Sequence, residues 1–344
     1  MKQIGVIQRA RLRNIPENLR ARHEYCFFLH DQCVHMLKEY AEKDAGLVTV
    51  NFQSDITAKQ FQEIAKAEDA VEALRKTGYP EEAKRVILNQ ITMAMASDCL
   101  HHIFEGLKCL EKRKIVVALN LLRKPLKDNL VYLAWMLGDE QEFYNEFITG
   151  DPERLTHKKL GNVRAEIFSK AIAKTELGSL INAAVLNALL FDRGNGDGLE
   201  MLFQHAVHLI TVQYIELRTS PENFNFIFKN PADDDIYHAV YGALPCILLF
   251  LAHVSASLFD RIRPRNKGSS AAFYVRSVQG YCLVEDKLQM ESVLDEILAQ
   301  HVVCLICGSK LKVTKYNAAR IVMTESFRCT HCRGTNAFPF SWLF

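Results

Sequence analysis

Residues 115–137 read IVVALNLLRKPLKDNLVYLAWML, and they give the clearest indication of the fold class. In a helix with this sequence apolar side chains occur on almost every face, so other elements must enclose it on most sides. Pro125 lies in the middle, where it removes one backbone hydrogen bond and crowds the preceding turn. We therefore predict a largely buried helix that is kinked at Pro125.

Helical patterns fill most of the chain before residue 300, and strand-like alternation is scarce before residue 311. Residues 79–82 (Tyr-Pro-Glu-Glu) are typical of a helix start, because proline is tolerated at the first helical position and carboxylates favour the positive end of the helix dipole. Further helices are predicted near residues 20–44, 57–77, 163–190, 198–218, 234–260 and 270–300. The fold class expected for the bulk of the chain is all-α.

The composition indicates a globular chain with a substantial core, because 49% of the 344 residues are hydrophobic and 24% are charged. We divide the chain into a helical body (1–262), a hinge with a connecting helix (263–300) and a small C-terminal module (301–344). Residues 263–270 (RPRNKGSS) are polar and contain Pro and Gly, which favours a hinge. The most hydrophobic window, 244–259, is short for a bilayer and contains a histidine, so we predict a buried core helix and no membrane partner.

Four of the ten cysteines form two pairs, Cys304-Leu-Ile-Cys307 and Cys329-Thr-His-Cys332, which are separated by twenty-one residues. Each pair makes a tight turn that directs two thiolates at one point, and four thiolates satisfy tetrahedral zinc at about 2.3 Å each. Four sulfur ligands leave no position open for water, so we predict a structural zinc ion. The alternatives are free or redox-active thiols, and a site in which His331 replaces a neighbouring cysteine.

This motif resembles a zinc ribbon, the small module found in transcription factors, polymerase subunits, ribosomal proteins and various nucleases. The resemblance covers residues 301–337 and is specific for the metal but not for a function. Residues 310–314 and 320–327 between the pairs alternate enough to predict two antiparallel strands, with a turn at Tyr316 and Asn317. The complete prediction is a mainly α protein with a multi-helix body and a small C-terminal β zinc ribbon.

The C-terminal module is strongly basic although the whole chain carries a net charge of only +2. Its six basic residues are Lys310, Lys312, Lys315, Arg320, Arg328 and Arg333, against the single acid Glu325. Such asymmetry is typical of a phosphate-binding surface on a protein that contacts DNA or RNA, and Lys310→Ala and Lys312→Ala should then weaken binding. The alternative is a ribbon that only braces the fold or docks a protein. The aromatic tail, residues 338–344, is expected to pack on the body or on a partner subunit, with base stacking as the alternative.

Three groups of histidines and acids are weaker candidates for chemistry. They are His30 and Asp31; Asp98, His101, His102 and Glu105; and His205 and His208. The first pair resembles the HD phosphohydrolases, but the further histidine that this family needs is available only as His23 on the same helix. A solvated surface explains the second group, and interior or interface histidines explain the third. An enzyme remains open if two of these groups converge in one pocket.

Residues 118–136 resemble uncharacterised bacterial helical families related to HEPN domains, some of which are RNases. HEPN ribonucleases carry an Arg followed after four to six residues by a His, and no Arg of this chain has a His at that offset, so the resemblance implies no catalysis. The charged residues here are Arg123, Lys124, Lys127 and Asp128, and an unpaired buried cluster among them would mark a ligand site.

The lone cysteines lie in apolar, helix-like segments and fit a reducing compartment, so we expect a cytoplasmic protein. They are Cys26, Cys33, Cys99, Cys109, Cys246 and Cys282. A homo-oligomer is expected. Three functions follow as hypotheses: a nucleic-acid-binding protein, a bacterial stress or defence effector with a purely structural ribbon, and a helical hydrolase or nuclease. The chain contains no P-loop, no HExxH sequence and no nucleophile elbow.

Overall fold

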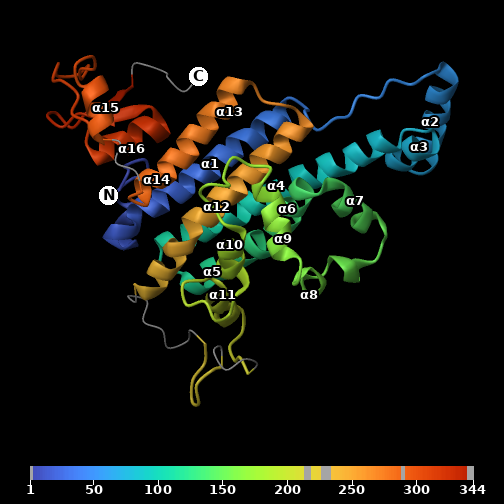
Figure 1. Ribbon diagram of the computed structural model, residues 1–344, viewed down its shortest axis with the longest axis horizontal. Helices are drawn as coiled ribbons and strands as arrows, with labels where there is room; N and C mark the ends of the chain where they lie inside the picture. The colour runs from blue at the N-terminus through green and yellow to red at the C-terminus, as the bar shows by residue number, and fades with distance from the viewer. Residues whose placement is uncertain (1–2, 213–217, 226–233, 288–290, 339–344) are drawn as a thin grey trace.

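The computed structural model describes residues 3–212, 218–225, 234–287 and 291–338. The described chain is mainly helical, which confirms the predicted fold class. Three long helices form the centre of the body: α1 (Arg20–Glu42), α4 (Pro80–Glu111) and α12 (Asp235–Ile262). Helix α1 packs along both α12 and α4 (Figure 1). By length and composition α12 could cross a membrane, but 83% of its most apolar window is buried inside the protein, as expected for a core helix.

The predicted kink at Pro125 takes the form of a π-helical turn, Lys124–Asn129, that joins α5 (Ile115–Arg123) to α6 (Leu130–Gly138). The N–H of Leu130 bonds to the carbonyl of Pro125, one residue further back than in an α-helix. This wider turn accommodates the proline ring without ending the helical run. Helix α6 is buried over nearly its whole length, as its sequence predicts.

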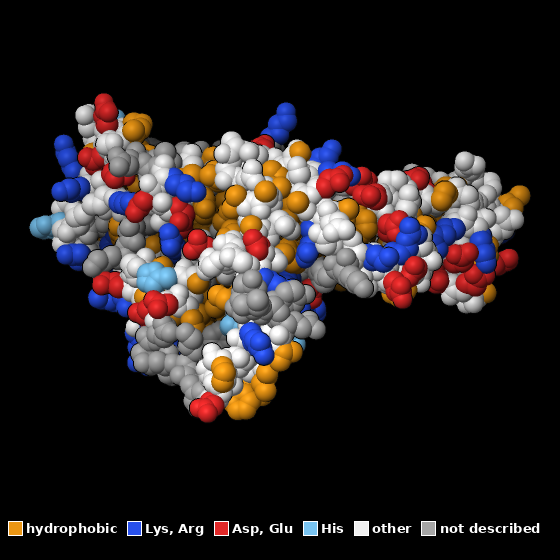
Figure 2. Space-filling model, turned by 60° about the horizontal axis from the view of Figure 1, so that its bottom comes forward, with side chains coloured by type: hydrophobic (Ala, Val, Ile, Leu, Met, Phe, Trp, Pro, Cys, Tyr) orange, Lys and Arg blue, Asp and Glu red, His pale blue; other side chains and the backbone are white. Residues whose placement is uncertain are grey.

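The other helices of the body are shorter. They are α2 (Asp55–Ala67), α3 (Ala70–Lys76), α7 (Glu140–Ile148), α8 (His157–Leu160), α9 (Arg164–Ile172), α10 (Ala183–Phe191) and α11 (Glu200–Val207), with 3₁₀ turns at Arg11–Asn14, Glu17–Leu19 and Pro152–Leu155. Helices α2 and α3 form an arm at the start of α4, at the opposite end of the molecule from the C-terminal module (Figure 1). Its surface shows interleaved acidic and basic side chains (Figure 2).

Two of the predicted long helices are broken where side chains cap a new helix. Asp69 accepts hydrogen bonds from the N–H groups of Val71 and Glu72, so α3 begins separately from α2. Asn182 caps α10 in the same way, after a loop that follows α9. In the predicted helix near residues 198–218, α11 ends at Val207, and residues 213–217 lie outside the described part of the chain.

The chain after residue 263 first returns along the body and then forms the C-terminal module. Helix α13 (Lys267–Tyr274), a second π-helical turn (Val275–Gln279) and α14 (Gly280–Val284) are continuous, and α14 contacts α1 and α12. Helix α15 (Glu291–Leu298) leads into the module, which contains α16 (Lys315–Thr324) and the strands β1 (Ser326–Arg328) and β2 (Thr335–Ala337). The strands are antiparallel, with Phe327 opposite Asn336.

The predicted ribbon strand at 320–327 is wrong over most of its length, because residues 315–324 form α16. Thr314 caps this helix through a hydrogen bond from the N–H of Asn317, and Glu325 ends it in a left-handed conformation with φ 45°. Residues 317–323 are all buried, so their apolar pattern indicated burial and not alternation. The tight turn predicted at Tyr316 and Asn317 is the first turn of this helix.

Candidate metal centre and basic cleft

The four cysteines of the two CxxC pairs come together in one cluster. All four sulfur atoms lie within 4.8 Å of one another, and the sulfurs of Cys304 and Cys332 are 3.6 Å apart. Those of Cys307 and Cys329 are 3.7 Å apart. Four sulfurs at about 2.3 Å from a tetrahedral ion would be separated by about 3.8 Å, so this cluster could bind a metal ion.

Two tight turns present the sulfurs. In the first, the N–H of Gly308 bonds to the carbonyl of Cys304 at 2.8 Å, and Gly308 has a φ of +71° that favours glycine. In the second, Arg333 takes the left-handed conformation with φ 64°, and its N–H bonds to the carbonyl of Cys329. Gly334 serves a different purpose, since a Cβ there would lie 2.3 Å from the Ile306 side chain of the first turn.

Donors around the first CxxC pair, Cys304 and Cys307, favour the thiolate form and lower the pKa of both thiols, whereas the neighbouring cysteines raise the pKa of Cys332. Burial raises the pKa of the Cys304 thiol, but the backbone N–H groups of Cys307 and Ile306 and the amide of Asn336 outweigh it and lower this pKa to about 6. The Asn336 side chain also accepts a hydrogen bond from the N–H of Leu305 at 2.9 Å, so it joins β2 to the first turn. A thiolate-favouring environment fits a metal ligand set.

Asn317, on the first turn of α16, holds the two halves of the module together. Its buried amide group donates to the carbonyls of Lys312 and Arg328 and accepts from the N–H of Arg328 at 2.9 Å. The sequence predicts a turn at Asn317 and gives no direct sign of this role. An asparagine in a segment that reads as buried was the available signal, because a buried amide has to find several partners.

The N-terminal segment, residues 4–7, lies between the body and the module. On one side it donates four successive backbone N–H groups to the buried carboxylate of Glu24 on α1, with N–O distances of 2.9–3.0 Å for residues 5–7. On the other side Arg320 of α16 donates to the carbonyls of Ile4 and Gly5. We call residues 4–7 with Glu24 and Arg320 the N-terminal clasp.

The six predicted basic residues divide into three groups. Arg320 is 7% exposed and bound within the N-terminal clasp, so it does not belong to the open surface. Lys310 and Lys312 are exposed but lie outside the cleft described next. The structure brings together the other three, which are Lys315, Arg328 and Arg333.

These three residues line a cleft of about 510 Å³ beside the second CxxC turn, which we call the basic cleft. Its other lining residues are Gln3, Thr314, Tyr316, Asn317, Cys329 and Thr330, so no carboxylate is among the described residues that line it. The side chain of Lys315 pairs with Asp286. Arg328 donates its Nε–H to the carbonyl of Arg333 at 2.9 Å, which orients its guanidinium.

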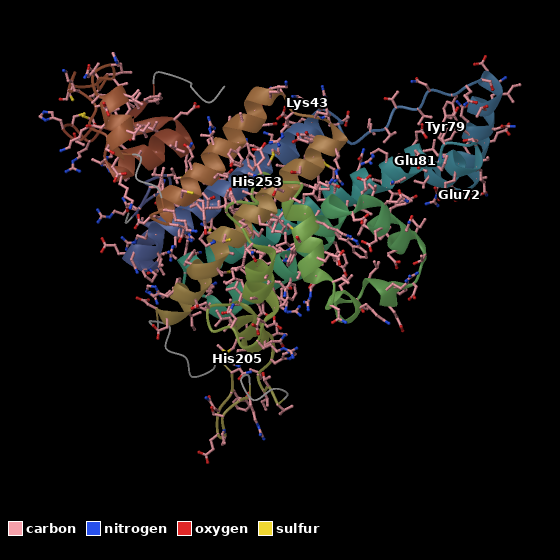
Figure 3. All side chains as sticks on the ribbon, in the orientation of Figure 1. Lys43, Glu72, Tyr79, Glu81, His205 and His253 are labelled. Atoms are coloured by element: carbon pink, nitrogen blue, oxygen red, sulfur yellow. The ribbon has the colours of Figure 1, made fainter. Side chains whose placement is uncertain are left out.

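The histidine and acid groups do not form a second centre. A metal site needs at least three His, Cys, Asp or Glu side chains close to one another. Among the described residues only the four cysteines of the cluster meet this condition. His30 bonds to the neighbouring Asp31 at 2.8 Å and packs against the Phe104 ring. His205 is part of α11 and lies well apart from His253 on α12 in Figure 3. His208 is exposed and follows the end of α11.

Two of the charged residues near Pro125, Lys124 and Lys127, form ion pairs in the structure. Asp98 binds Lys124 at 2.9 Å and Asn129 at 2.7 Å, and these contacts hold α4 against the π-helical turn. The buried Lys127 pairs with Glu200 of α11. Asp98 and Lys127 are therefore parts of the packing between helices. His101 and Glu105 are exposed, and His102 bonds to the carbonyl of Asp98 at 2.9 Å.

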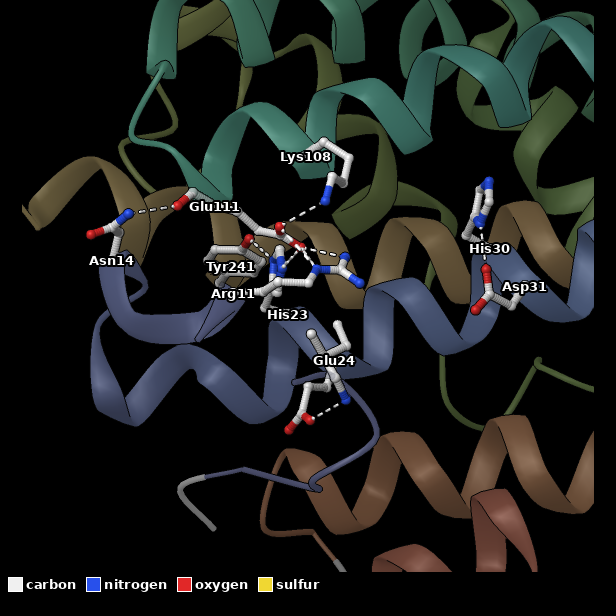
Figure 4. Close-up of polar contacts among 10 residues, drawn as sticks. Arg11, Asn14, His23, Glu24, His30, Asp31, Lys108, Glu111 and Tyr241 are labelled. Atoms are coloured by element: carbon white, nitrogen blue, oxygen red, sulfur yellow. Dashed lines mark hydrogen bonds and ion pairs between the residues drawn. The ribbon is translucent and has the colours of Figure 1, made fainter. Parts of the chain in front are cut away.

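A buried network around Glu111, shown in Figure 4, attaches the start of the chain to α4. The carboxylate accepts from Arg11 Nη2 at 2.6 Å and from Lys108 at 3.1 Å, and His23 Nε2 lies at 3.4 Å. Since Nε2 of His23 faces a carboxylate, it carries the proton, and Nδ1 accepts from the Tyr241 hydroxyl. Burial raises the pKa of Glu111, but bonds from His23, Arg11 and Lys108 outweigh it and lower this pKa to about 2.

Glu111→Gln is expected to remove part of the acid sensitivity of folding. A carboxyl whose pKa is lowered by folding stabilises the protein above the unfolded value of 4.5, and this contribution is lost as pH falls toward about 2. We expect the variant to lose about 2–3 kcal/mol at pH 7 and less at pH 3. Denaturant unfolding at both pH values measures this, with the exposed Glu105→Gln on the same helix as the control. Equal losses at both pH values would contradict the assignment.

Comparisons with protein-family models, with curated proteins and with solved structures give no match to this chain, so the argument for its function rests on the site itself.

Proposed function

We propose that the four-cysteine cluster binds zinc as a structural ion, and that the module it organises binds the phosphates of DNA or RNA through the basic cleft. The observation that carries the proposal is the placement of Lys315, Arg328 and Arg333 around one cleft without a lining carboxylate. Cations that share one cleft neutralise phosphates better than cations scattered over a surface, because each adds to the same local potential. Arg328 and Arg333 contribute most here, since Asp286 offsets part of the charge of Lys315.

The fold favours an anion at this place in a second way. Thr314, Lys315, Tyr316 and Asn317 line the cleft and form the cap and first turn of α16, so the positive end of the helix dipole faces it. Backbone N–H groups at a helix N-terminus bind phosphate oxygens without regard to base sequence. We therefore propose binding to the nucleic-acid backbone and no base recognition.

Zinc is the metal that the ligand set favours. Thiolates are soft ligands, and four of them in tetrahedral arrangement are typical of structural zinc sites. In this proposal the ion holds the second CxxC turn, and with it Arg328 and Arg333, in the geometry of the cleft. The ion takes no part in a reaction, since four sulfurs complete its coordination.

Replacing Arg328 and Arg333 by alanine is expected to weaken nucleic-acid binding about tenfold at 100 mM salt, because two phosphate contacts are lost. The slope of log K against log salt should become less negative by about 2. Filter binding with a 20-nucleotide single-stranded RNA and a 20-base-pair DNA at several salt concentrations measures both effects. The two substrates also show whether RNA or DNA is preferred.

The matched control is Lys59→Ala with Lys66→Ala, which removes two exposed lysines from α2 at the opposite end of the molecule (Figure 1). Its affinity and salt slope should equal those of the unmodified protein. If both double variants bind alike, or if neither substrate is retained at 50 mM salt, the basic cleft is not a nucleic-acid site. The module would then brace the body, a role that its attachment through Arg320 and the N-terminal clasp already supports.

A further inference from the structure

A second cleft, of about 530 Å³, lies on the helical body between the end of α9, the second half of α12 and α13. We call it the polar cleft. Its charged and histidine side chains are Lys174, Glu176, His253, Asp260, Arg265 and Lys267. None of them belongs to the metal module or the basic cleft, so an inference drawn here is independent of the proposed nucleic-acid function.

The protonation state of His253 follows from its neighbours. Ser277 has one hydroxyl proton, and its oxygen lies within bonding distance of two carbonyls, that of Phe273 at 2.6 Å and that of Tyr274 at 3.2 Å. The Ser277 hydroxyl therefore donates its proton to a carbonyl. Its oxygen accepts a hydrogen bond from Nε2–H of His253 at 2.9 Å. Nδ1 of His253 is left as an acceptor, with no hydrogen-bond partner among the described residues.

This imidazole stays neutral over the physiological pH range. His253 is only 6% exposed. Burial, with a smaller effect from the positive charge of Arg265, lowers the pKa of His253 to about 3. His253 lines the cleft and its Nδ1 is not among the buried atoms that lack a partner, so a molecule in the cleft can donate a hydrogen bond to it. A ligand with a hydroxyl or amide proton would satisfy it.

Two lysines of the polar cleft form no ion pair with a described residue and can therefore bind an anion. Arg265 and Asp260 neutralise each other through two bonds, from Nε to Oδ1 at 2.8 Å and from Nη2 to Oδ2 at 2.7 Å. Lys174 and Lys267 are exposed and have no carboxylate within ion-pair distance among the described residues. Glu176 is the remaining acid of the lining, so two lysines stand against one carboxylate.

The backbone beside His253 is also irregular. Helix α13 continues into the π-helical turn Val275–Gln279, and Tyr274 and Val275 at that junction line the cleft. A π-helical turn is less favourable than α-helix and occurs often at functional sites. Here it places Ser277 under His253, the contact that sets the tautomer.

From these features we infer that the polar cleft binds a small phosphorylated sugar. Lys174 and Lys267 bind the phosphate, and Nδ1 of His253 accepts a hydrogen bond from a sugar hydroxyl. The cleft lies within the range of about 300–1,000 Å³ that small-ligand sites occupy. A single phosphate suits it better than a polyphosphate, because the lining offers two unpaired lysines and also one acid.

The test is calorimetry with ribose 5-phosphate as the probe, compared with inorganic phosphate and with ribose. Ribose 5-phosphate should bind at least tenfold more tightly than either fragment, since only it engages both the lysines and His253. Lys174→Ala with Lys267→Ala should weaken its binding at least tenfold, while Lys59→Ala with Lys66→Ala should leave it unchanged. Absence of binding at millimolar ribose 5-phosphate, or equal binding of inorganic phosphate, overturns the inference.

A second readout uses the unmodified protein, so it does not depend on a buried variant that folds. In a long-range proton–nitrogen NMR spectrum, His253 should show a protonated Nε2 and an unprotonated Nδ1. The Nδ1 signal should shift on saturation with ribose 5-phosphate and stay in place with inorganic phosphate. A His253 signal that ribose 5-phosphate leaves unchanged would show that the histidine does not contact the ligand.

Discussion

Chelation of the metal is expected to unfold residues 302–338 while the helical body keeps its structure. Backbone hydrogen bonds close each CxxC turn, but few contacts other than the thiol cluster and the Asn336 side chain join one turn to the other. The sheet consists of two strands of three residues each. A structural zinc site supplies on the order of 10 kcal/mol to a module of this size. The hydrophobic core includes buried residues of α16, but most of it lies in the helical body around α1, α4 and α12, which supplies no ligand to the ion.

Hydrogen exchange read by mass spectrometry measures this directly. Peptides that cover α16 and β1 should lose protection after chelation, and peptides from α4 and α12 should not. Elemental analysis should give one zinc ion per chain, close to none in Cys329→Ser, and one in the control Cys282→Ser, which changes a half-buried cysteine outside the cluster. Protection that survives metal removal would show that packing alone holds the module.

The sequence was sufficient to predict that the four cysteines form one cluster and to predict most long helices. A doubled CxxC pattern has few other uses in a chain of this kind, and an apolar stretch such as 115–137 can only be enclosed. The identity of the segment between the pairs was harder to predict. Ile321 and Val322 favour a strand locally, yet the segment is helical because Thr314 caps it and α14 and the π-helical turn Val275–Gln279 cover it.

The cleft and the clasp could not be predicted, because both depend on contacts between distant parts of the chain. Six basic residues looked equivalent in the sequence, but packing turned Arg320 inward and brought Arg328 and Arg333 beside Lys315. Residues 4–7 carry no pattern that indicates a structural role. Only Gly5 was informative in retrospect, since it has a φ of +82° and a Cβ there would meet the Tyr316 hydroxyl at 2.3 Å.

Glu24→Ala is expected to destabilise the protein by on the order of 4 kcal/mol, the largest effect that we predict for one side chain of the body. The Glu24 carboxylate is fully buried and accepts the N–H groups of residues 4–7. Burial raises the pKa of this carboxyl, and the four N–H groups act against that rise. Without the carboxylate these N–H groups would stay buried without an acceptor.

Urea unfolding of the full chain measures the loss, and Glu39→Ala, an exposed glutamate on the same helix, should cost less than about 0.5 kcal/mol. Glu24→Gln should fall between the two, because its amide oxygen still accepts while its NH₂ group faces other donors. A loss of less than about 1 kcal/mol for Glu24→Ala would mean that water replaces the carboxylate and that the clasp is not tight.

A double-mutant cycle with Arg320→Ala then tests whether the clasp joins the body to the module. Glu24 accepts hydrogen bonds from the N–H groups of residues 4–7, and Arg320 donates hydrogen bonds to the carbonyls of Ile4 and Gly5. Both sets of hydrogen bonds therefore depend on the position of the same short segment. Once Glu24 is replaced and the segment is released, removing Arg320 should cost little more. We expect a coupling energy of about 1–3 kcal/mol, and strictly additive losses would show that the two side chains act independently.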